Sequence, residues 1–209
     1  MKGLIIGSGR LGDLSLLKEE AASADRIVCA DGGALYLSEA GILPDVLLGD
    51  MDSIAPEKER ELRDRGVEIL VHPAEKDDTD MALAVRYLAE QGAGELHILG
   101  GTGSRIDHML GNALLVSYAA EKGIRIELID ENNVITALRT ETVSKKREYL
   151  SVIPLDETVV VSLKGVKYPL DTHTIRRGSS LGISNEILED TCDVILHEGR
   201  GLLIQSSDA

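Results

Sequence analysis

Short apolar segments alternate with helical segments from the N-terminus to about residue 130. The apolar segments are rich in Leu, Ile and Val, as strands buried on both faces are. We expect strands at Leu4–Ile6, Arg26–Ala30, Asp45–Leu48, Val67–Val71, Glu95–Leu99 and Arg125–Ile129. Between them the pattern predicts helices near residues 13–23, 56–65, 78–91 and 107–122. This alternation is typical of an α/β domain with a mostly parallel, Rossmann-like sheet covered by helices on both faces.

Two of the predicted helices show a clear helical repeat of apolar or small residues. In the first, the i, i+3, i+4 and i+7 positions are held by Met81, Ala84, Val85 and Leu88. Gly92 follows as a signal that ends the helix. In the second, the repeat precedes Gly123 and consists of Leu110, Ala113, Leu114, Ser117 and Tyr118.

The pattern changes after Asn132 and Asn133, where strands follow one another with no long helix between them. His197–Gly201 resembles a hairpin connection between the last two strands. We therefore predict an α/β domain over residues 1–132 and an all-β sandwich domain over residues 133–209. The predicted strands of the second domain are Val134–Leu138, Tyr149–Ile153, Thr158–Leu163, Cys192–Leu196 and Leu202–Gln205.

Composition narrows the range of functions. Hydrophobic residues make up 43% of the 209, which is enough for a core, but the chain has no Trp or Phe and only five Tyr. The net charge of −14 disfavours a nucleic-acid partner, which needs a basic surface. The apolar run at the N-terminus is too short for a signal peptide or a membrane span, and Cys29 and Cys192 have no metal-like spacing. We expect a cytoplasmic protein that does not associate with membranes.

A dinucleotide-binding fingerprint follows the first strand. Gly7-Ser8-Gly9-Arg10-Leu11-Gly12 fits G-x-G-x-x-G, and Asp31 lies at the end of the second strand, directly after Ala30, near the place where a ribose-binding acid is expected. The pattern alone suggests an NAD-dependent dehydrogenase. Glycines serve any tight strand-to-helix turn, however, and we favour a loop that borders the active site, because a dehydrogenase leaves the motifs that follow unexplained.

Carboxylates follow the second and third predicted strands. Asp31 is followed by two glycines, which allow a sharp turn or a close approach to a ligand. After the third strand, Asp50 and Asp52 project from the same face if the extended backbone continues. Two neighbouring carboxylates repel each other unless a cation lies between them, and Mg²⁺ takes one or two carboxylates together with phosphate oxygens.

A third acidic segment, Lys76-Asp77-Asp78-Thr79-Asp80, opens the helix near 78–91. Asp77 or Asp78 can cap that helix, with Asp80 in its first turn. Capping alone is a complete structural explanation, although three carboxylates exceed what a cap requires. A metal or phosphate site would use the same positions.

A glycine-rich loop, Gly100-Gly101-Thr102-Gly103-Ser104-Arg105, joins the fifth strand to the last helix. The N–H groups of such a loop and of a helix N-terminus suit an anion, and the planar Arg105 guanidinium can clamp phosphate oxygens. Asp107 can cap the helix, accept from a nucleotide, or do both, whereas His108 is interpreted as a polar helix residue. No G-K-[ST] follows, so this is not a Walker loop.

The three acidic segments and the glycine-rich loop all follow strands. These four motifs should therefore meet at the carboxyl edge of a parallel sheet, where open α/β folds bind ligands. Carboxylates, a glycine loop and an arginine together predict a site for a metal and a nucleoside triphosphate.

Read in order, these motifs resemble the thiamine pyrophosphokinase family. The matching segments are DGGA (31–34), PDVLLGDMDSI (44–54), KDDTDMALA (76–84), GGTGSRIDHMLGN (100–112), SLKGVKYPL (162–170) and GSSLGISNE (178–186). The resemblance implies an α/β catalytic domain, a C-terminal β-sandwich and a homodimer. It also implies that the active site lies at the dimer interface, where the second domain of the partner chain reaches thiamine.

The resemblance assigns a role to each matching residue. Asp50, Asp52, Asp77 and Asp80 match acidic positions that bind Mg²⁺, and Asp52, Asp77 and Asp80 with Arg105 match catalytic ones. The positions that match the ATP side are Asp31, Thr79, Gly101, Gly103, Arg105 and Asp107. Ser184 and Asn185 match the thiamine side. Some members carry Trp in the second domain where this chain has Tyr168 and Ile204, so thiamine's rings are expected to rest on aliphatic side chains.

The implied reaction is attack of the thiamine hydroxyl on the β-phosphorus of ATP, with AMP as the second product. Asp77 and Asp80 are both candidates for accepting the hydroxyl proton. Two alternatives stay open: transfer of the same group to a pterin alcohol, and a non-catalytic sensor of the nucleotide or of thiamine.

Overall fold

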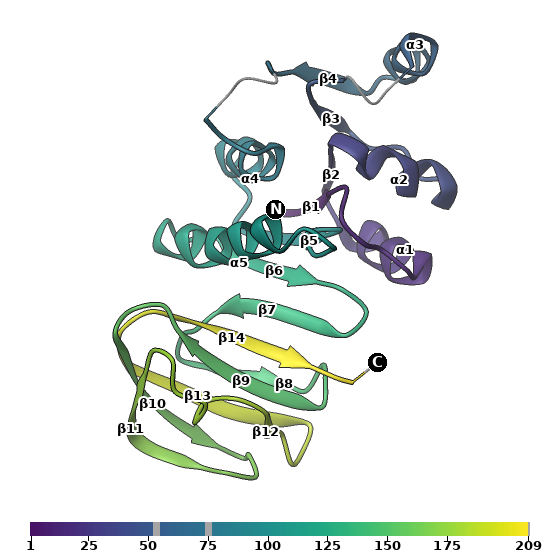
Figure 1. Ribbon diagram of the computed structural model, residues 1–209. Coiled ribbons are helices and arrows are strands. Elements are labelled where there is room, and N and C mark those ends of the chain that lie inside the picture. Colours follow the sequence, from purple (N-terminus) through teal and green to yellow (C-terminus); the bar gives the residue numbers. More distant parts are fainter. Residues whose placement is uncertain (52–54, 74–76, 209) are drawn as a thin grey trace.

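The computed structural model describes residues 1–51, 55–73 and 77–208. Two sheets and a set of helices account for the regular structure (Figure 1). The helical elements are α1 (Leu14–Ser23), η1 (Asp31–Gly33, a short 3₁₀ turn), α2 (Ala34–Ala40), α3 (Pro56–Asp64), α4 (Asp80–Glu90) and α5 (Ile106–Glu121).

The first six strands pair in parallel, in the spatial order β4-β3-β2-β1-β5-β6. Their bounds are β1 (Lys2–Ile6), β2 (Arg26–Ala30), β3 (Val46–Gly49), β4 (Glu68–Val71), β5 (Glu95–Leu99) and β6 (Arg125–Ile129). The predicted strands of the α/β half all lie here, and three of them have the predicted bounds. We did not predict α2, because Gly32 and Gly33 just before it favour a turn.

The same sheet continues into the second half of the chain. β7 pairs antiparallel with β6 through Leu128–Ile135 and Ile129–Val134, and β14, β9 and β12 follow, which gives a mixed sheet of ten strands. A second sheet has the order β11-β10-β13-β8. The strands are β7 (Asn133–Ala137), β8 (Glu141–Ser144), β9 (Tyr149–Pro154), β10 (Thr158–Lys164), β11 (Leu170–Arg176), β12 (Asn185–Glu186), β13 (Thr191–Glu198) and β14 (Gly201–Ser206).

This continuity refines the expected architecture. The second half is rich in β-strands, as predicted, but it shares its larger sheet with the α/β half. The boundary at residue 132 stays a prediction. The hairpin expected at His197–Gly201 is wrong: β13 belongs to the four-stranded sheet and β14 to the ten-stranded one, so this turn carries the chain between sheets. A side chain at Gly199, whose φ is +85°, would meet the carbonyl oxygen of Thr158 at 2.4 Å.

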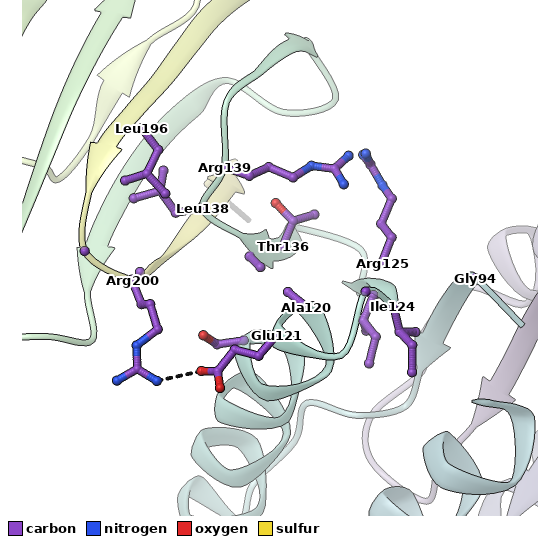
Figure 2. A pocket seen from close by; sticks show the side chains of 16 residues that line it. Gly94, Ala120, Glu121, Ile124, Arg125, Thr136, Leu138, Arg139, Leu196 and Arg200 are labelled. Atoms are coloured by element: carbon purple, nitrogen blue, oxygen red, sulfur yellow. Dashed lines mark hydrogen bonds and ion pairs between the residues drawn. The ribbon is translucent and has the colours of Figure 1, made fainter. Parts of the chain in front are cut away.

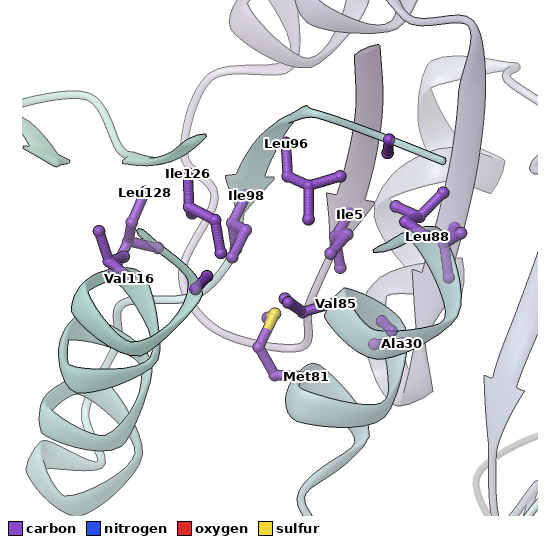
Figure 3. Packing of buried hydrophobic residues seen from close by; sticks show 14 of the residues in the cluster. Ile5, Ala30, Met81, Val85, Leu88, Leu96, Ile98, Val116, Ile126 and Leu128 are labelled. Carbon is purple, nitrogen blue, oxygen red and sulfur yellow. The ribbon is translucent and has the colours of Figure 1, made fainter. Parts of the chain in front are cut away.

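Side-chain alternation distributes the core over both faces of the large sheet. On one face, a single cluster holds Ile5 of β1, Met81, Val85 and Leu88 of α4, and Val116 of α5, which lies beside Leu128 of β6 (Figure 3). On the opposite face, the strand residues pack against Leu17 of α1, Leu37 of α2 and Leu62 of α3. A third cluster lies between the two sheets and includes Val152, Val161, Val194 and Leu203. The packing is almost entirely aliphatic, as the composition requires.

The predicted repeat in α5 has a different outcome from that in α4. Ala113 and Ser117 are buried, but Leu110, Leu114 and Tyr118 are 55%, 55% and 58% exposed. With Ile106, which is 65% exposed, they form a stripe at four-residue spacing along one side of the helix. We call these four residues the α5 stripe. Apolar spacing predicted the helix correctly but did not indicate which of its apolar residues are buried.

A network of charged side chains fastens α1 to the sheet. The Glu20 carboxylate lies 2.7 Å from Nδ1 of buried His97 and 3.0 Å from Nζ of Lys2. His97 also lies 3.2 Å from Glu95 and 3.9 Å from buried Glu127. The hydrogen bond with His97 is the main cause that lowers the pKa of Glu20 from 4.5 to about 2, against the opposing effect of burial.

We expect Glu20→Gln to weaken the acid dependence of stability. A carboxyl whose pKa is lowered by folding stabilises the native state above its unfolded pKa, and this contribution is lost as the pH falls from 4.5 towards 2. After allowance for solvent screening we expect the variant to lose about 1 kcal/mol near pH 6 and little near pH 2. Urea unfolding at both pH values measures this difference. Glu19→Gln, at the exposed neighbouring position, is the control, and a pH-independent effect of Glu20→Gln would contradict the assignment.

Candidate active site

A cavity of about 960 Å³ opens at the carboxyl edge of the parallel strands. Its walls come from the loop after β1, the end of β2, the start of α4, the loop after β5 and one side of α5. Seven of the predicted site residues line it: Asp77, Thr79, Asp80, Gly101, Gly103, Arg105 and Asp107. Two of the four motifs expected to meet at the strand ends, those around residues 77–80 and 100–105, therefore line one cavity.

The fingerprint loop and the glycine loop cross each other in the wall of this cavity. The Gly9 N–H donates to the Gly100 carbonyl at 2.8 Å, and the Arg10 N–H donates to the Thr102 carbonyl at 2.7 Å. A Cβ at Gly9 would lie 2.1 Å from the Thr102 oxygen, and one at Gly7 would lie 2.6 Å from the Gly100 oxygen. These glycines thus allow two backbones to touch, which agrees with a loop that borders the site.

Side chains on the far side hold the glycine loop in place. The Asn112 amide, in the second turn of α5, donates to the Gly101 carbonyl at 2.7 Å. The Thr102 hydroxyl donates to the Asp130 carboxylate at 2.9 Å. No role was predicted for Asn112 or Asp130, although Asp130 directly follows β6, the parallel neighbour of β5, where the strand-end rule applies.

The start of α4 differs from the expected cap. Thr79 is the N-cap residue, and its hydroxyl accepts from the Ala82 N–H at 3.2 Å. The cap predicted at Asp77 or Asp78 is therefore wrong; Asp78, which precedes the helix, instead pairs with Arg86 inside α4. Asp80 is in the first turn as predicted, and both Asp77 and Asp80 line the cavity. Because Thr79 caps the helix, capping does not explain why Asp77 and Asp80 stand at these positions.

Arg105 and Asp107 form a pair at the start of α5. Arg105 is the N-cap residue without a side-chain cap bond, and its Nη2 lies 2.6 Å from Oδ2 of Asp107. Their side chains are 67% and 64% exposed. The hydrogen bond from Arg105 lowers the pKa of Asp107. Asp107 lies in the first turn of α5 and is not its N-cap residue. An anion in the cavity would meet the guanidinium, the helix N-terminus and the loop N–H groups together.

The remaining acidic positions lie further along the edge. Asp31 begins η1 directly after β2, and its side chain is outside the described part of the structure. Asp50 is half-buried after β3, but Met51 has φ +62°, so the extended backbone that would align Asp50 with Asp52 does not continue. Asp52, like Lys76, lies outside the described residues. A left-handed non-glycine residue is strained, and such strain is concentrated at functional sites.

Whether Mg²⁺ fits depends on the donors present. Asp77 and Asp80 supply two carboxylates to the cavity, which matches the preference of Mg²⁺ for one or two carboxylates plus phosphate oxygens. Within residues 1–51, 55–73 and 77–208, no group of three or more His, Cys, Asp or Glu side chains is placed to hold a metal ion. The donor set fits an ion that is shared with a bound polyphosphate.

The residues predicted to bind thiamine lie far from this cavity within one chain. Ser184 and Asn185 are at β12, five strand positions from β5 in the sheet, which is roughly 24 Å at the usual strand spacing. Asn185 is buried, and its amide accepts from the Tyr168 N–H at 3.0 Å and donates to the Tyr168 carbonyl at 2.8 Å. It thereby holds Tyr168, whose side chain is 61% exposed.

A second cavity, of about 440 Å³, lies between the C-terminal end of α5, β7 and the β13–β14 turn (Figure 2). Arg200 lines it and pairs with Glu121 of α5 at 2.6 Å, as the dashed line in Figure 2 marks. Arg125 and Arg139, which also line it, both pair with Glu141. None of the predicted site residues lines this cavity.

No helix in the described part of the chain has the length and apolarity needed to cross a membrane.

Comparison with known proteins finds the same family over both halves. A family model described as the catalytic domain of thiamin pyrophosphokinase matches residues 17–128, and one described as the vitamin B1 binding domain of thiamin pyrophosphokinase matches residues 135–203. The thiamine pyrophosphokinase of Bacillus subtilis is 35% identical over 183 residues, which is 85% of this chain and 86% of that protein. Thiamine pyrophosphokinase 1 of Oryza sativa is 28% identical and covers 78% of this chain and 72% of its own.

Solved structures agree with this match. A crystal structure of the thiamine pyrophosphokinase from Bacillus subtilis superposes with a TM-score of 0.88 at 30% identity and covers the whole of both chains. One of the thiamin pyrophosphokinase from Geobacillus thermodenitrificans gives 0.84 at 36% identity, over 100% of this chain and 99% of the other.

We expect Arg105→Ala to weaken the binding of magnesium-ATP by about tenfold or more, because alanine cannot offer a phosphate the charge-assisted, two-pronged contact that a guanidinium offers. Arg105→Lys should recover only part of it, since Lys keeps the charge but not the fork. Isothermal titration calorimetry measures both. The matched control is Arg63→Ala, which breaks a similar exposed pair with Glu59 at 2.8 Å in α3. Unchanged affinity in Arg105→Ala would remove Arg105 from the site.

Proposed function

Because this chain belongs to the thiamine pyrophosphokinase family, we propose that it transfers the pyrophosphoryl group of ATP to the hydroxyl of thiamine. The products are thiamine diphosphate and AMP. The observation that carries the proposal is the cavity at the strand ends, where the start of α4, the glycine loop and the start of α5 present carboxylates, N–H groups and a guanidinium to one ligand. The family match over both halves identifies the acceptor.

In this reaction the thiamine oxygen forms a bond to the β-phosphorus of ATP, and the bond between that phosphorus and the oxygen of the α-phosphate breaks. Transfers of this kind depend on positioning and on stabilisation of negative charge. Arg105 and the glycine loop, with Gly101 and Gly103, supply positive charge and N–H donors to the phosphates. Asp31, Thr79 and Asp107 complete the proposed ATP side. Asp77 and Asp80 stay joint candidates for accepting the hydroxyl proton.

Asp77 and Asp80 are the described residues that would hold Mg²⁺, with Asp50 and Asp52 as further proposed ligands. When bound, the ion neutralises phosphate charge. Asp50 follows β3, three strand positions from β5 and thus about 14 Å along the edge, so it would serve a different part of the ligand from the glycine loop.

We also propose that the enzyme is a homodimer with shared active sites, in which Ser184 and Asn185 of one subunit bind thiamine at the cavity of the other. The distance of about 24 Å between these residues and β5 within one chain supports this arrangement. The exposed α5 stripe supports it as well, because two of its residues, Leu114 and Tyr118, line the cavity and the stripe offers an apolar face for a second copy.

Three finer proposals concern the molecule as a whole. The first six strands pair in parallel, which supports a mostly parallel, Rossmann-like domain over residues 1–132. The packing between the two sheets supports a β-sandwich over residues 133–209. Cys29 and Cys192 are buried thiols, which supports a cytoplasmic location.

The reaction is tested by separating the products formed from ATP, Mg²⁺ and thiamine. We expect AMP and thiamine diphosphate in equal amounts. ADP with thiamine monophosphate would refute pyrophosphoryl transfer, and binding of both substrates without AMP would identify a sensor. A pterin alcohol offered in place of thiamine serves as the acceptor control and should give no AMP above background.

Shared sites predict complementation between two inactive variants. Arg105→Ala damages the ATP side and Asn185→Ala the thiamine side, so each alone should have little activity. After the two are mixed and allowed to exchange subunits, half of the dimers are mixed and hold one intact site, which should restore roughly a quarter of the wild-type rate. Light scattering should give the mass of a dimer. A dimer without any recovery would argue that each site belongs to a single chain.

A further inference from the structure

The turn between β6 and β7 contacts both loops that cross in the wall of the cavity. Asp130 and Glu131 stand where the chain passes from its α/β half to its β-rich half. Asp130 accepts the Thr102 hydroxyl of the glycine loop at 2.9 Å. The Glu131 carboxylate accepts the Gly12 N–H, and it accepts the Asp13 N–H at 3.2 Å. The two neighbouring carboxylates thus hold one loop each.

Asp130 is only 8% exposed, and its carboxylate is surrounded by donors. Its Oδ1 accepts the N–H groups of Asn132 and Asn133 at 2.9 and 2.7 Å, and the Asn133 amide at 2.9 Å. Oδ2 accepts the Thr102 hydroxyl. A buried carboxylate is costly unless its oxygens are bonded, so these contacts make the turn rigid and leave Oδ2 aimed at Thr102.

The β-rich half holds the same turn from the other side. Arg147, between β8 and β9, donates from Nη2 to the Asp130 carbonyl at 2.9 Å. The Ser207 N–H, just after β14, donates to the Asn132 carbonyl at 2.9 Å. The position of the turn therefore depends on both halves of the chain.

Gly12, the last glycine of the fingerprint, fits this arrangement. A Cβ there would lie 2.9 Å from Oε1 of Glu131. The glycine thus leaves room for the Glu131 carboxylate to reach the loop backbone, just as Gly7 and Gly9 leave room for the glycine loop. All three fingerprint glycines are explained without a dinucleotide.

We propose that Asp130 and Glu131 are positioning residues for the ATP side of the active site, and that they align the glycine loop and the fingerprint loop for the polyphosphate. Neither residue lines the cavity, so they act through Thr102, Gly12 and Asp13. This inference rests on the proposed function. It predicts that loss of these contacts raises the KM for ATP and leaves the KM for thiamine unchanged.

Glu131→Ala and Glu131→Gln separate the hydrogen bond from other effects. Glutamine retains an acceptor oxygen for the Gly12 and Asp13 N–H groups, whereas alanine does not. We expect Glu131→Ala to raise the KM for ATP by about tenfold, with a smaller fall in kcat, and Glu131→Gln to stay within about twofold of wild type. Binding of magnesium-ATP, measured by calorimetry without thiamine, should weaken in parallel.

Thr102→Val and Thr102→Ser test the other contact in the same way, because valine has the shape of threonine without the hydroxyl and serine retains the hydroxyl. Thr142→Val is the matched control: it breaks a similar bond, from the Thr142 hydroxyl to Asp193 at 2.8 Å, in the four-stranded sheet. A thermal melt of each variant confirms that it is folded.

Three results would overturn the inference: an unchanged KM for ATP in folded Glu131→Ala and Thr102→Val, an equal rise in the KM for thiamine, or the same defect in Glu131→Gln as in Glu131→Ala. These outcomes are distinct from failure of the proposed function, in which the wild-type protein itself would release no AMP.

Discussion

The contact between two glycine-rich backbones at the ends of β1 and β5 is the constraint on which the site depends. Gly7 and Gly9 approach the carbonyl oxygens of Gly100 and Thr102 too closely for any side chain to fit between them. Because β1 and β5 are parallel neighbours, their exits necessarily meet, and glycine is what allows the meeting to be a backbone contact. One wall of the cavity is therefore formed by peptide groups with fixed directions, which is suited to binding an anion.

The fold places the other groups around this contact. α4 and α5 lie on the same face of the sheet (Figure 1) and pack there through aliphatic residues such as Leu88 and Val116. The N-terminal residues of both helices line the cavity. Asp80 and Arg105 occupy these two helix starts. A triphosphate and its cation would thus meet carboxylates at one helix start and a guanidinium at the other.

Most of this could be predicted from the sequence, because it depends on local pattern. The buried parallel strands are short runs of branched aliphatic residues, and the rule that ligands bind at strand ends brings the motifs together. What could not be predicted depends on partners far away in sequence. Thr102 and Asp130 are 28 residues apart, and Gly12 and Glu131 are 119 apart. Strands β8, β11 and β12 are short or largely exposed, so they lack the apolar signal. The turn between β13 and β14, where the chain changes sheet, is as short as a hairpin turn. The length of a turn alone does not show whether its two strands pair with each other.

The continuous sheet also limits how the two halves can be separated. In the intact chain β6 is an interior strand, paired with β5 on one side and β7 on the other. A fragment that ended at residue 132 would expose the backbone groups of β6 on a strand whose side chains Ile126, Leu128 and Ile129 are apolar. Such an edge is a template for pairing with other chains and for aggregation. The halves are thus not interchangeable modules: a substitute for either one would have to supply a strand that covers this edge.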